Sequence, residues 1–165
     1  MNDTAKPPDP QALAEAVARS MWAEDRASQS MGMQIVAVAP GRAELTMPVR
    51  GDMLNGHAIC HGGFIFTLAD SAFAFACNSG NMNTVASGCS IDFLMPAREG
   101  DVLTAVAAER SSSGRTGVYD IEVRNQRSEV VALFRGKSYR IRGNVIATEA
   151  PPGMQTQADA AHGTR

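Results

Sequence analysis

An almost uninterrupted apolar stretch between Phe64 and Cys77 constrains the fold of this chain most strongly. Every residue within it is apolar or small except Thr67, Asp70 and Ser71. A helix that is apolar on all sides belongs inside a core, so we expect a long buried helix here. An ionised carboxylate is costly to bury without partners. Asp70 is therefore expected to be hydrogen-bonded, to face an interface cavity, or to be kept for chemistry.

Two glycines, Gly62 and Gly63, precede the apolar stretch. Where a helix begins, its first backbone N–H groups are unpaired and the positive end of its dipole points outward. Such a helix start attracts an oxyanion or a polarised carbonyl oxygen. A Gly-Gly pair can also serve only to permit close packing. It is evidence for a binding site because it lies at a helix start, eight residues before Asp70.

The spacing between Gly62 and Asp70 predicts a site that two chains share. Eight helical residues span about 12 Å, which is too far for one carbonyl group to meet both ends. Two chains packed with these helices antiparallel would bring Asp70 of one towards Gly62 of the other, and a two-fold axis would make two such sites. We therefore expect a composite active site at a homodimer interface.

Length and composition limit the classes of protein to consider. A chain of 165 residues can build one core but not two ordinary domains. Its net charge of -2 gives no electrostatic footprint for nucleic acid. The chain start lacks an apolar signal segment, and no stretch approaches the roughly 20 apolar residues that span a bilayer. With Cys60, Cys77 and Cys89 in apolar settings, we expect reduced thiols in a cytoplasmic protein with no membrane or nucleic-acid partner.

The rest of the chain predicts one further helix and a series of strands. Apolar residues recur at helical spacing from Pro10, and Gly32 closes that amphipathic region. Alternating apolar residues separated by turn formers then predict six strands. They cover Gln34 to Val38, Arg42 to Val49, Thr84 to Leu94, Asp101 to Arg110, Thr116 to Gln126 and Val130 to Ile141.

The third and fourth of these strands carry clear alternation. The expected buried face of the third consists of Val85, Cys89, Ile91 and Phe93. In the fourth, the alternating residues are Val102, Thr104 and Val106. Ser111 to Gly114 should form the turn to the fifth strand, and Arg127 to Glu129 the link to the sixth.

A sheet of about six strands with one long helix to cover it has open edges. Wrapping the sheet around the central helix buries that helix, and joining two sheets edge to edge removes an exposed edge. Both features describe the hotdog fold, an α+β architecture, here with an additional N-terminal helix. We place this single domain at residues 10–143, between a disordered N-terminus at 1–9 and a disordered C-terminal tail at 144–165.

Five segments of the chain carry the pattern of a known family. They are Asn55-Gly56, the run from His61 to Ala74 with its His-Gly-Gly and Asp70, Ser90 to Pro96, Gly114 to Asp120, and Phe134 to Ser138. Together they resemble the PaaI-type acyl-CoA thioesterases of phenylacetate degradation. The resemblance covers roughly Leu13 to Gly143. The Asn…His-Gly-Gly…Asp pattern marks the wider hotdog thioesterases, and the later segments narrow it to the PaaI group.

The resemblance implies hydrolysis of an aryl acyl-CoA, of the phenylacetyl-CoA or hydroxyphenylacetyl-CoA class, to free acid and CoA. It makes Asp70 the nucleophile or the base that activates water, and the Gly62 N–H a donor to the thioester oxygen. Asn55 and His61 would shape and polarise the site across the dimer. The family usually forms homotetramers from two such dimers. CoA is part of the substrate, so no separate cofactor is expected.

The resemblance also places a CoA contact at the turn before the fifth strand. Backbone N–H groups together with an arginine suit an anion, although solvated turns of this composition are common. Gly114, Arg115 and Thr116 are the candidates, with Lys137 a weaker one. The contact is expected to cross a subunit boundary.

Asp70 also has a structural interpretation, as a buried carboxylate capped by Ser71, Asn55 or a group of a partner chain. The chemistry of a thioester is also compatible with a catalytic role for Asp70. The leaving thiol resembles a Cys side chain with a pKa near ~8.5, so it departs without a strong general acid. A carboxylate and an oxyanion donor suffice.

Other functions and sites stay open at the level of sequence. A non-catalytic acyl-CoA-binding regulator would need no carboxylate opposite the thioester, and a hotdog hydratase or dehydratase would carry an aspartate–histidine hydration motif that we do not find. His57, Cys60 and His61 lack a convincing fourth ligand, so we expect no metal site. The acyl group depends on how four large side chains pack, namely Trp22, Met53, Phe64 and Phe73.

Overall fold

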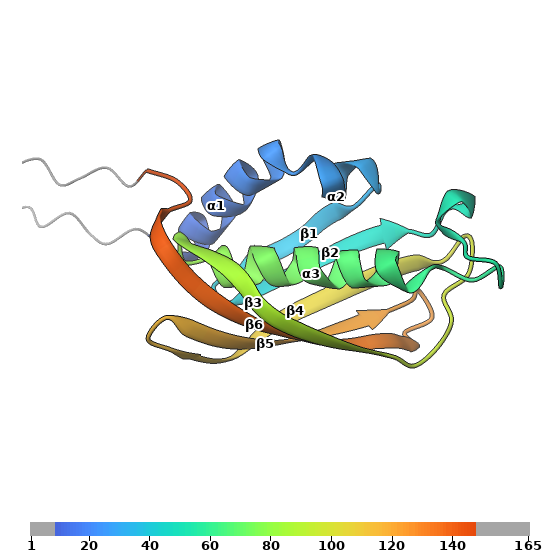
Figure 1. Ribbon diagram of the computed structural model, residues 1–165. Helices are drawn as coiled ribbons and strands as arrows, with labels where there is room; N and C mark the ends of the chain where they lie inside the picture. Colours follow the sequence, from blue (N-terminus) through green and yellow to red (C-terminus); the bar gives the residue numbers. More distant parts are fainter. Residues whose placement is uncertain (1–8, 148–165) are drawn as a thin grey trace, which may run out of the picture.

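A six-stranded antiparallel sheet curves around one long helix in the computed structural model, which describes residues 9–147 (Figure 1). The long helix α3 (Gly62–Asn78) lies in the concave side of the sheet. Helix α1 (Pro10–Glu24) and the short α2 (Arg26–Ser30) pack beside α3 and strand β1. The predicted α+β hotdog architecture with an additional N-terminal helix is confirmed.

All six predicted strands are present, with ends that differ by a few residues from the expected ones. They are β1 (Gln34–Ala39), β2 (Arg42–Pro48), β3 (Met82–Phe93), β4 (Val102–Ser113), β5 (Thr116–Arg124) and β6 (Val130–Asn144). Their order across the sheet is β1-β2-β4-β5-β6-β3, and all neighbours are antiparallel. The chain therefore runs from β2 through α3 to the far edge of the sheet before it returns to β4. This route makes β3 an edge strand.

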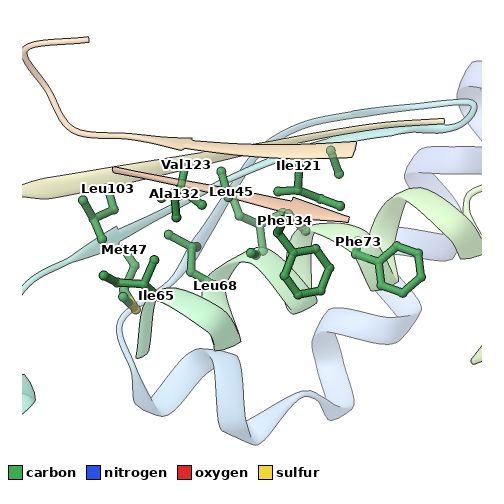
Figure 2. Packing of buried hydrophobic residues seen from close by; sticks show 14 of the residues in the cluster. Leu45, Met47, Ile65, Leu68, Phe73, Leu103, Ile121, Val123, Ala132 and Phe134 are labelled. Atoms are coloured by element: carbon green, nitrogen blue, oxygen red, sulfur yellow. The ribbon is translucent and has the colours of Figure 1, made fainter. Parts of the chain in front are cut away.

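The core lies between α3 and the inner face of the sheet (Figure 2). Leu68 and Phe73 of α3 are 0% and 1% exposed. Burying one such side chain stabilises the fold by about 1.5–3 kcal/mol. The Phe73 ring packs against Tyr119 and Phe134, with centroid separations of 5.4 and 6.2 Å. It also covers Gly136, where a β-carbon would lie 2.9 Å from the ring, so this strand position has room only for glycine.

The predicted buried face of β3 is wrong in part. A bulge between Ala86 and Gly88 shifts the register, so Val85 faces the outer side of the sheet with Tyr139. The other three candidates share the inner face opposite buried residues of β6: Cys89, Ile91 and Phe93. Cys89 and Phe93 are nevertheless exposed, because β3 is the edge of the sheet and α3 covers it only in part.

The structure also corrects the strand β4 and the turn after it. The inner face of β4 consists of Leu103, Ala105 and Ala107, so the alternating set that begins at Val102 faces outward. The strand continues to Ser113, and only Gly114 and Arg115 form the turn to β5. The prediction of a turn from Ser111 is therefore wrong for its first three residues.

Both ends of the described chain are tied to the domain. Asp9 caps α1 by accepting a hydrogen bond from the Gln11 N–H (3.2 Å), and the Ile146 N–H donates to Asn81 Oδ1 (2.8 Å). The ordered chain thus extends past the predicted domain end at 143, because β6 reaches Asn144 and Ile146 is held by Asn81. Residues 1–8 and 148–165 lie outside the described residues, so the disorder predicted for them stays a prediction. None of the helices between residues 9 and 147 combines the length and the apolar character needed to cross a lipid bilayer.

Candidate active site

A cavity of about 580 Å³ opens beside the start of α3. Three of the four predicted catalytic residues line it: Asn55, His61 and Gly62. The opposite wall comes from the end of β3 and the residues after it, Phe93 to Pro96. The fourth predicted catalytic residue, Asp70, does not line this cavity.

His61 is the N-cap residue of α3, a role that the sequence did not predict. Its Nδ1 accepts a hydrogen bond from the Gly63 N–H (3.0 Å), and its backbone N–H donates to the Met53 carbonyl (2.8 Å). An Nδ1 that accepts leaves the proton of the neutral imidazole on Nε2. His61 therefore fixes the helix start and offers an Nε2–H donor beside the cavity.

The Gly62 N–H is the amide that the cap leaves free. The Phe64 N–H donates to the His61 carbonyl (3.0 Å), and the Gly63 N–H is taken by the His61 ring. Within residues 9–147 no acceptor pairs with the Gly62 N–H. An unpaired amide at the positive end of a 17-residue helix dipole suits an oxygen that carries negative charge.

Asn55 belongs to a tight loop that folds back onto the helix start. Its backbone N–H donates to the Ile59 carbonyl (2.9 Å), and its Oδ1 accepts from the His57 N–H (2.9 Å). A bridge between Leu54 and Cys60 closes the loop at its base. The half-buried Asn55 side chain is thereby held at the cavity with its oxygen already engaged.

Asp70 is half-buried and, within the described chain, takes part in no hydrogen bond or ion pair. Burial raises the pKa of its carboxyl group above the ordinary value of 3.8. Neither cap considered for a structural role bonds to Asp70 within the described chain. Ser71 Oγ shares a hydrogen bond with Ser28 Oγ (2.8 Å), and the only hydrogen bond of the Asn55 side chain there is the one that its Oδ1 accepts from the His57 N–H. The structural interpretation therefore lacks a partner within one chain.

Asp70 and Gly62 occupy different parts of the same helix. Eight residues separate them, which corresponds to about 12 Å along the axis. Gly63, Thr67 and Asp70 follow one another at four- and three-residue spacing on a strip of α3 that the sheet does not bury. The structure thus brings Asn55, His61 and Gly62 together and leaves Asp70 on an uncovered helix face.

The cysteines give no nucleophile near the cavity. Burial raises the pKa of Cys60 to about 11 and that of Cys77 to about 12, so both are protonated thiols at neutral pH. Among residues 9–147 no three His, Cys, Asp or Glu side chains gather in an arrangement that could hold a metal ion.

The predicted CoA contacts lie at the other end of the molecule from the cavity (Figure 1). Ser79, just after α3, accepts a hydrogen bond from the Gly41 N–H, and the Gly41 carbonyl accepts from the Glu109 N–H (both 2.8 Å). The turn at Gly114 and Arg115 lies beyond Glu109 on β4. These residues are therefore near the C-terminal end of α3, too far to reach Gly62 of their own chain.

Two further candidates complete this group. Thr116 Oγ1 donates to the Ser113 carbonyl (3.1 Å) and so closes the turn. Lys137 is exposed on the outer face of β6, opposite Val118. Arg140, which the sequence did not single out, braces the turn through Ser112 Oγ (3.2 Å). Basic side chains thus gather around one hairpin end.

The large side chains expected to set the depth of the acyl pocket are placed elsewhere. Met53 and Phe73 are core residues, and Trp22 packs on Phe75 with a centroid separation of 6.2 Å. None of these, nor Phe64, lines the cavity at Gly62. The sequence did not lead us to predict that the residues at the end of β3 line the cavity, although a run of apolar residues before Pro96 is visible in it.

Comparison with known proteins gives consistent matches. The model of the Thioesterase superfamily matches residues 57–132, which include His61, Gly62 and Asp70. In sequence, the chain is 52% identical over 128 residues to acyl-coenzyme A thioesterase PaaI of Escherichia coli strain K12. That match covers 78% of this chain and 91% of the relative.

Solved structures agree with the sequence comparison. The E. coli PaaI protein from the phenylacetic acid degradation operon matches with a TM-score of 0.81 and 49% identity, over 82% of this chain and 99% of that one. The protein smu.793 of Streptococcus mutans UA159, solved with acetyl CoA bound, matches with a TM-score of 0.65 and 28% identity. That match covers 68% of this chain and 90% of the other.

Proposed function

We propose an aryl acyl-CoA as the substrate of this chain, which belongs to the PaaI group of the thioesterase superfamily and is a thioester hydrolase. The reaction would release the free acid and CoA. The observation that carries the proposal is the unpaired Gly62 N–H at the edge of a cavity without charged lining residues. The 52% identity to E. coli PaaI, a protein from the phenylacetic acid degradation operon, supports the choice of the phenylacetyl class.

The start of α3 would polarise the thioester. A carbonyl oxygen placed against the Gly62 N–H gains a hydrogen bond and the field of the helix dipole as negative charge develops on it. One such donor is typically worth ~10²–10³ in rate. Asn55 and His61, which line the same cavity, would hold the group in place through their free amide and Nε2–H donors.

The carboxylate would come from Asp70 of a second copy of the chain. Asp70 is about 12 Å from its own Gly62 along the helix, and its side of α3 is left uncovered by the sheet. Strand β3 ends the sheet with an open edge and carries the exposed apolar residues Val85 and Phe93. Joining two sheets along β3 would cover that edge and bring two α3 helices together.

Hydrolysis is chemically balanced whether Asp70 acts as a base or as a nucleophile. As a base, its carboxylate takes a proton from water while the water oxygen attacks the thioester carbon; as a nucleophile, it attacks that carbon itself and water then cleaves the anhydride. In both routes the C–S bond breaks, CoA leaves as a thiolate, and the thiolate takes up a proton. A raised pKa makes the carboxylate a stronger base, which suits the first route.

The partner subunit would supply the residues that bind the CoA part of the substrate. The group at Gly114, Arg115 and Thr116, with Lys137 on the neighbouring β6, lies near the C-terminal end of α3. Antiparallel helices would bring that end towards the partner's Gly62. An arginine and a lysine beside backbone amides match the phosphates of CoA.

A second interface would join two dimers into a tetramer. The outer face of the sheet carries the exposed side chains of Leu133 (44%) and Tyr139 (40%). Beside them Asp120 accepts hydrogen bonds from Arg135 Nε (2.7 Å) and Arg110 Nε (3.0 Å). Exposed apolar side chains among paired charges are typical of an interface with another protein surface. Light scattering behind size exclusion measures the mass: four chains support this interface, and a dimer would contradict it.

A thiol-release assay tests the proposed function directly. Phenylacetyl-CoA and hydroxyphenylacetyl-CoA should release CoA faster than straight-chain acyl-CoAs of similar size. Asp70→Asn should lower the rate by ~10²–10⁴, because it removes the carboxylate and keeps the shape. Glu15→Gln, which removes an exposed carboxylate on α1 away from β3 and the cavity, is the control and should keep the rate. No thiol release from any ester would contradict the proposal and favour a non-catalytic binding protein.

A further inference from the structure

The segment that ends β3 keeps a group of apolar side chains at the cavity. Phe93, Leu94 and Met95 are 53%, 53% and 42% exposed, and all three line the cavity together with Pro96. The N–H groups of Leu94 and Met95 both donate to the Val131 carbonyl, at 2.9 and 3.3 Å. The backbone therefore leaves the regular strand here, so consecutive side chains can face one cavity rather than alternate.

Phe93 lies directly against Gly62. A β-carbon built on Gly62 would be 2.9 Å from Phe93 Cζ and 3.3 Å from each of the two Cε atoms. The tip of the ring thus occupies the place that a side chain at position 62 would take. The φ angle of Gly62 is not positive, so the backbone itself would accept another residue. A side chain at position 62 would therefore have to displace the Phe93 ring, to which the three atoms nearest the added β-carbon all belong.

The chemistry of the cavity fits an apolar group. Among residues 9–147 no Asp, Glu, Lys or Arg lines it, and its walls include Ile59, Ile65 and Pro96. Its polar groups gather at the helix start, where His61 and the free Gly62 N–H lie. A thioester whose oxygen meets that N–H can therefore place its acyl group among the apolar walls, with the Phe93 ring next to the reacting carbon.

We propose that Phe93 is the residue that determines which acyl group the enzyme accepts, and that position 62 is glycine in order to admit its ring. The inference rests on the proposed function, because it assumes that the thioester oxygen binds at Gly62. The ring would limit the width of the cavity beside the thioester carbon. It would admit a single aromatic ring and disfavour a fused one.

Paired substrates and a matched control test this assignment. In Phe93→Ala, the ratio of kcat/KM for 2-naphthylacetyl-CoA to that for phenylacetyl-CoA should rise about tenfold or more, within the range by which a pocket discriminates small changes of apolar size. Val36→Ala is the control, because Val36 is 56% exposed on β1, at the opposite edge of the sheet from β3. It should leave the ratio unchanged. An unchanged ratio in Phe93→Ala would overturn the proposal.

A double-mutant cycle separates the ring from the backbone amide. Gly62→Ala keeps the N–H but places a methyl group where the ring tip lies, so the exposed Phe93 side chain must move. Its substrate ratio should shift in the direction of Phe93→Ala. In the double variant the methyl group meets no ring, so the two shifts should not multiply. Independent, multiplicative shifts would show that the two residues do not act together and would overturn the proposal.

Binding of stable analogues distinguishes this inference from the proposed function. The thioethers S-(2-phenylethyl)-CoA and S-(2-naphthylethyl)-CoA cannot be hydrolysed, and calorimetry gives their Kd values. A preference for the phenyl analogue that Phe93→Ala removes supports the role of Phe93 even if the parent hydrolysed nothing. Thioester hydrolysis by the parent, with analogue preferences that ignore Phe93, would overturn this inference alone.

Discussion

Ser71 and Ser28 share a hydrogen bond of 2.8 Å between their hydroxyl oxygens, which ties α3 to the short helix α2. Ser28 is 1% exposed, so the bond is shielded from water. Ser71 is therefore committed to α2 and does not cap the neighbouring Asp70. The uncovered side of α3 consequently presents a carboxylate without a partner in the described chain, next to a serine that packing has already used.

The unpartnered carboxylate should cost stability. Burial raises the pKa of Asp70 above 3.8, so the folded chain holds this proton more tightly than the unfolded chain does. The stability from protonated Asp70 is complete below 3.8 and is lost as the pH rises through the raised pKa. At neutral pH, Asp70→Asn should therefore melt at a higher temperature than the parent, while Glu15→Gln, at an exposed carboxylate on α1, should not. A lower Tm for Asp70→Asn would reveal a structural partner instead.

The raised pKa of Asp70 also predicts how hydrolysis depends on pH. The active form has Asp70 ionised, so kcat/KM should fall as the pH drops through its raised pKa. The midpoint of this acidic limb should lie above 3.8, the ordinary value for an aspartate. Residual hydrolysis by Asp70→Asn should lack the limb. A parent profile that stays flat through this range would show that another group limits the rate.

Arg115 should act on CoA binding more than on chemistry. It lies in the turn between β4 and β5, away from its own Gly62. Losing one charge-assisted contact to a phosphate should raise KM for the CoA ester about tenfold and leave kcat within a few-fold. Arg19→Ala, on the exposed side of α1, is the control. A fall in kcat at unchanged KM would place Arg115 in a different role.

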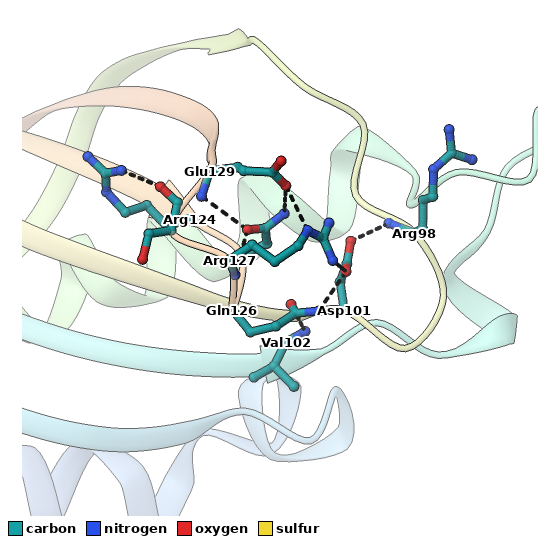
Figure 3. A network of polar contacts seen from close by, with 9 residues as sticks. Arg98, Asp101, Val102, Arg124, Gln126, Arg127 and Glu129 are labelled. Carbon is teal, nitrogen blue, oxygen red and sulfur yellow. Dashed lines mark hydrogen bonds and ion pairs between the residues drawn. The ribbon is translucent and has the colours of Figure 1, made fainter.

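Asp101 should stabilise the segment that joins β3 to β4, and Figure 3 shows the polar contacts that hold it. It is 4% exposed and accepts hydrogen bonds from the Arg98 N–H (2.9 Å), Gln126 Nε2 (2.9 Å) and Arg127 (3.1 Å). Burial alone would raise the pKa of Asp101, but these bonds outweigh it and hold the pKa below 3.8. Its contribution is therefore present above pH 3.8 and lost as the pH falls through the lowered pKa.

Asp101→Asn should lower the free energy of unfolding by roughly 2 kcal/mol at neutral pH, because hydrogen bonds to a buried charge are weakened. Urea denaturation measures the loss, and Asp52→Asn is the control. Asp52 pairs with Arg50 at the surface, so its removal should change little. Equal stability of Asp101→Asn and the parent would mean that water replaces the carboxylate contacts.

The Gly62 amide can be removed with little damage to the fold. Proline is favoured at the first position of a helix, and His61, at φ -64° and ψ 132°, already has the extended backbone that precedes proline. Gly62→Pro should lower kcat by ~10²–10³ relative to Gly62→Ala, which adds a β-carbon but keeps the N–H. Equal rates for the two variants would exclude this amide as the oxyanion donor.

Local patterns in the sequence were sufficient to predict the architecture. The apolar run after Gly63 predicts α3, and alternation predicts all six strands, because core burial dictates both patterns. The inner face of β3 was only partly predicted, because the bulge between Ala86 and Gly88 changes the register. Gly88, a residue type that often marks a bulge inside a strand, was its one sign in the sequence and was not used. The turn after β4 was misplaced, because three serines can continue a strand as readily as end one.

The site residues on α3 could be predicted from the sequence, whereas the contact that β3 makes with the start of α3 could not. Gly62 and Asp70 follow from their spacing on α3, and the lack of contact between them was expected. His61 as a cap is hidden, because His is not among the residues that usually occupy this position. The contact between Phe93 and Gly62 joins distant segments, so only the folded chain reveals it.

Mixing two inactive variants tests the central claim, that each active site takes Gly62 from one chain and Asp70 from another. Gly62→Pro and Asp70→Asn homodimers should each be nearly inactive. If the chains are unfolded and refolded together in equal amounts, half of the dimers are mixed and one of the two sites in each is intact. We predict recovery of about a quarter of the parent thiol-release rate. A mixture that forms hybrid dimers yet stays as inactive as its components would contradict the shared site.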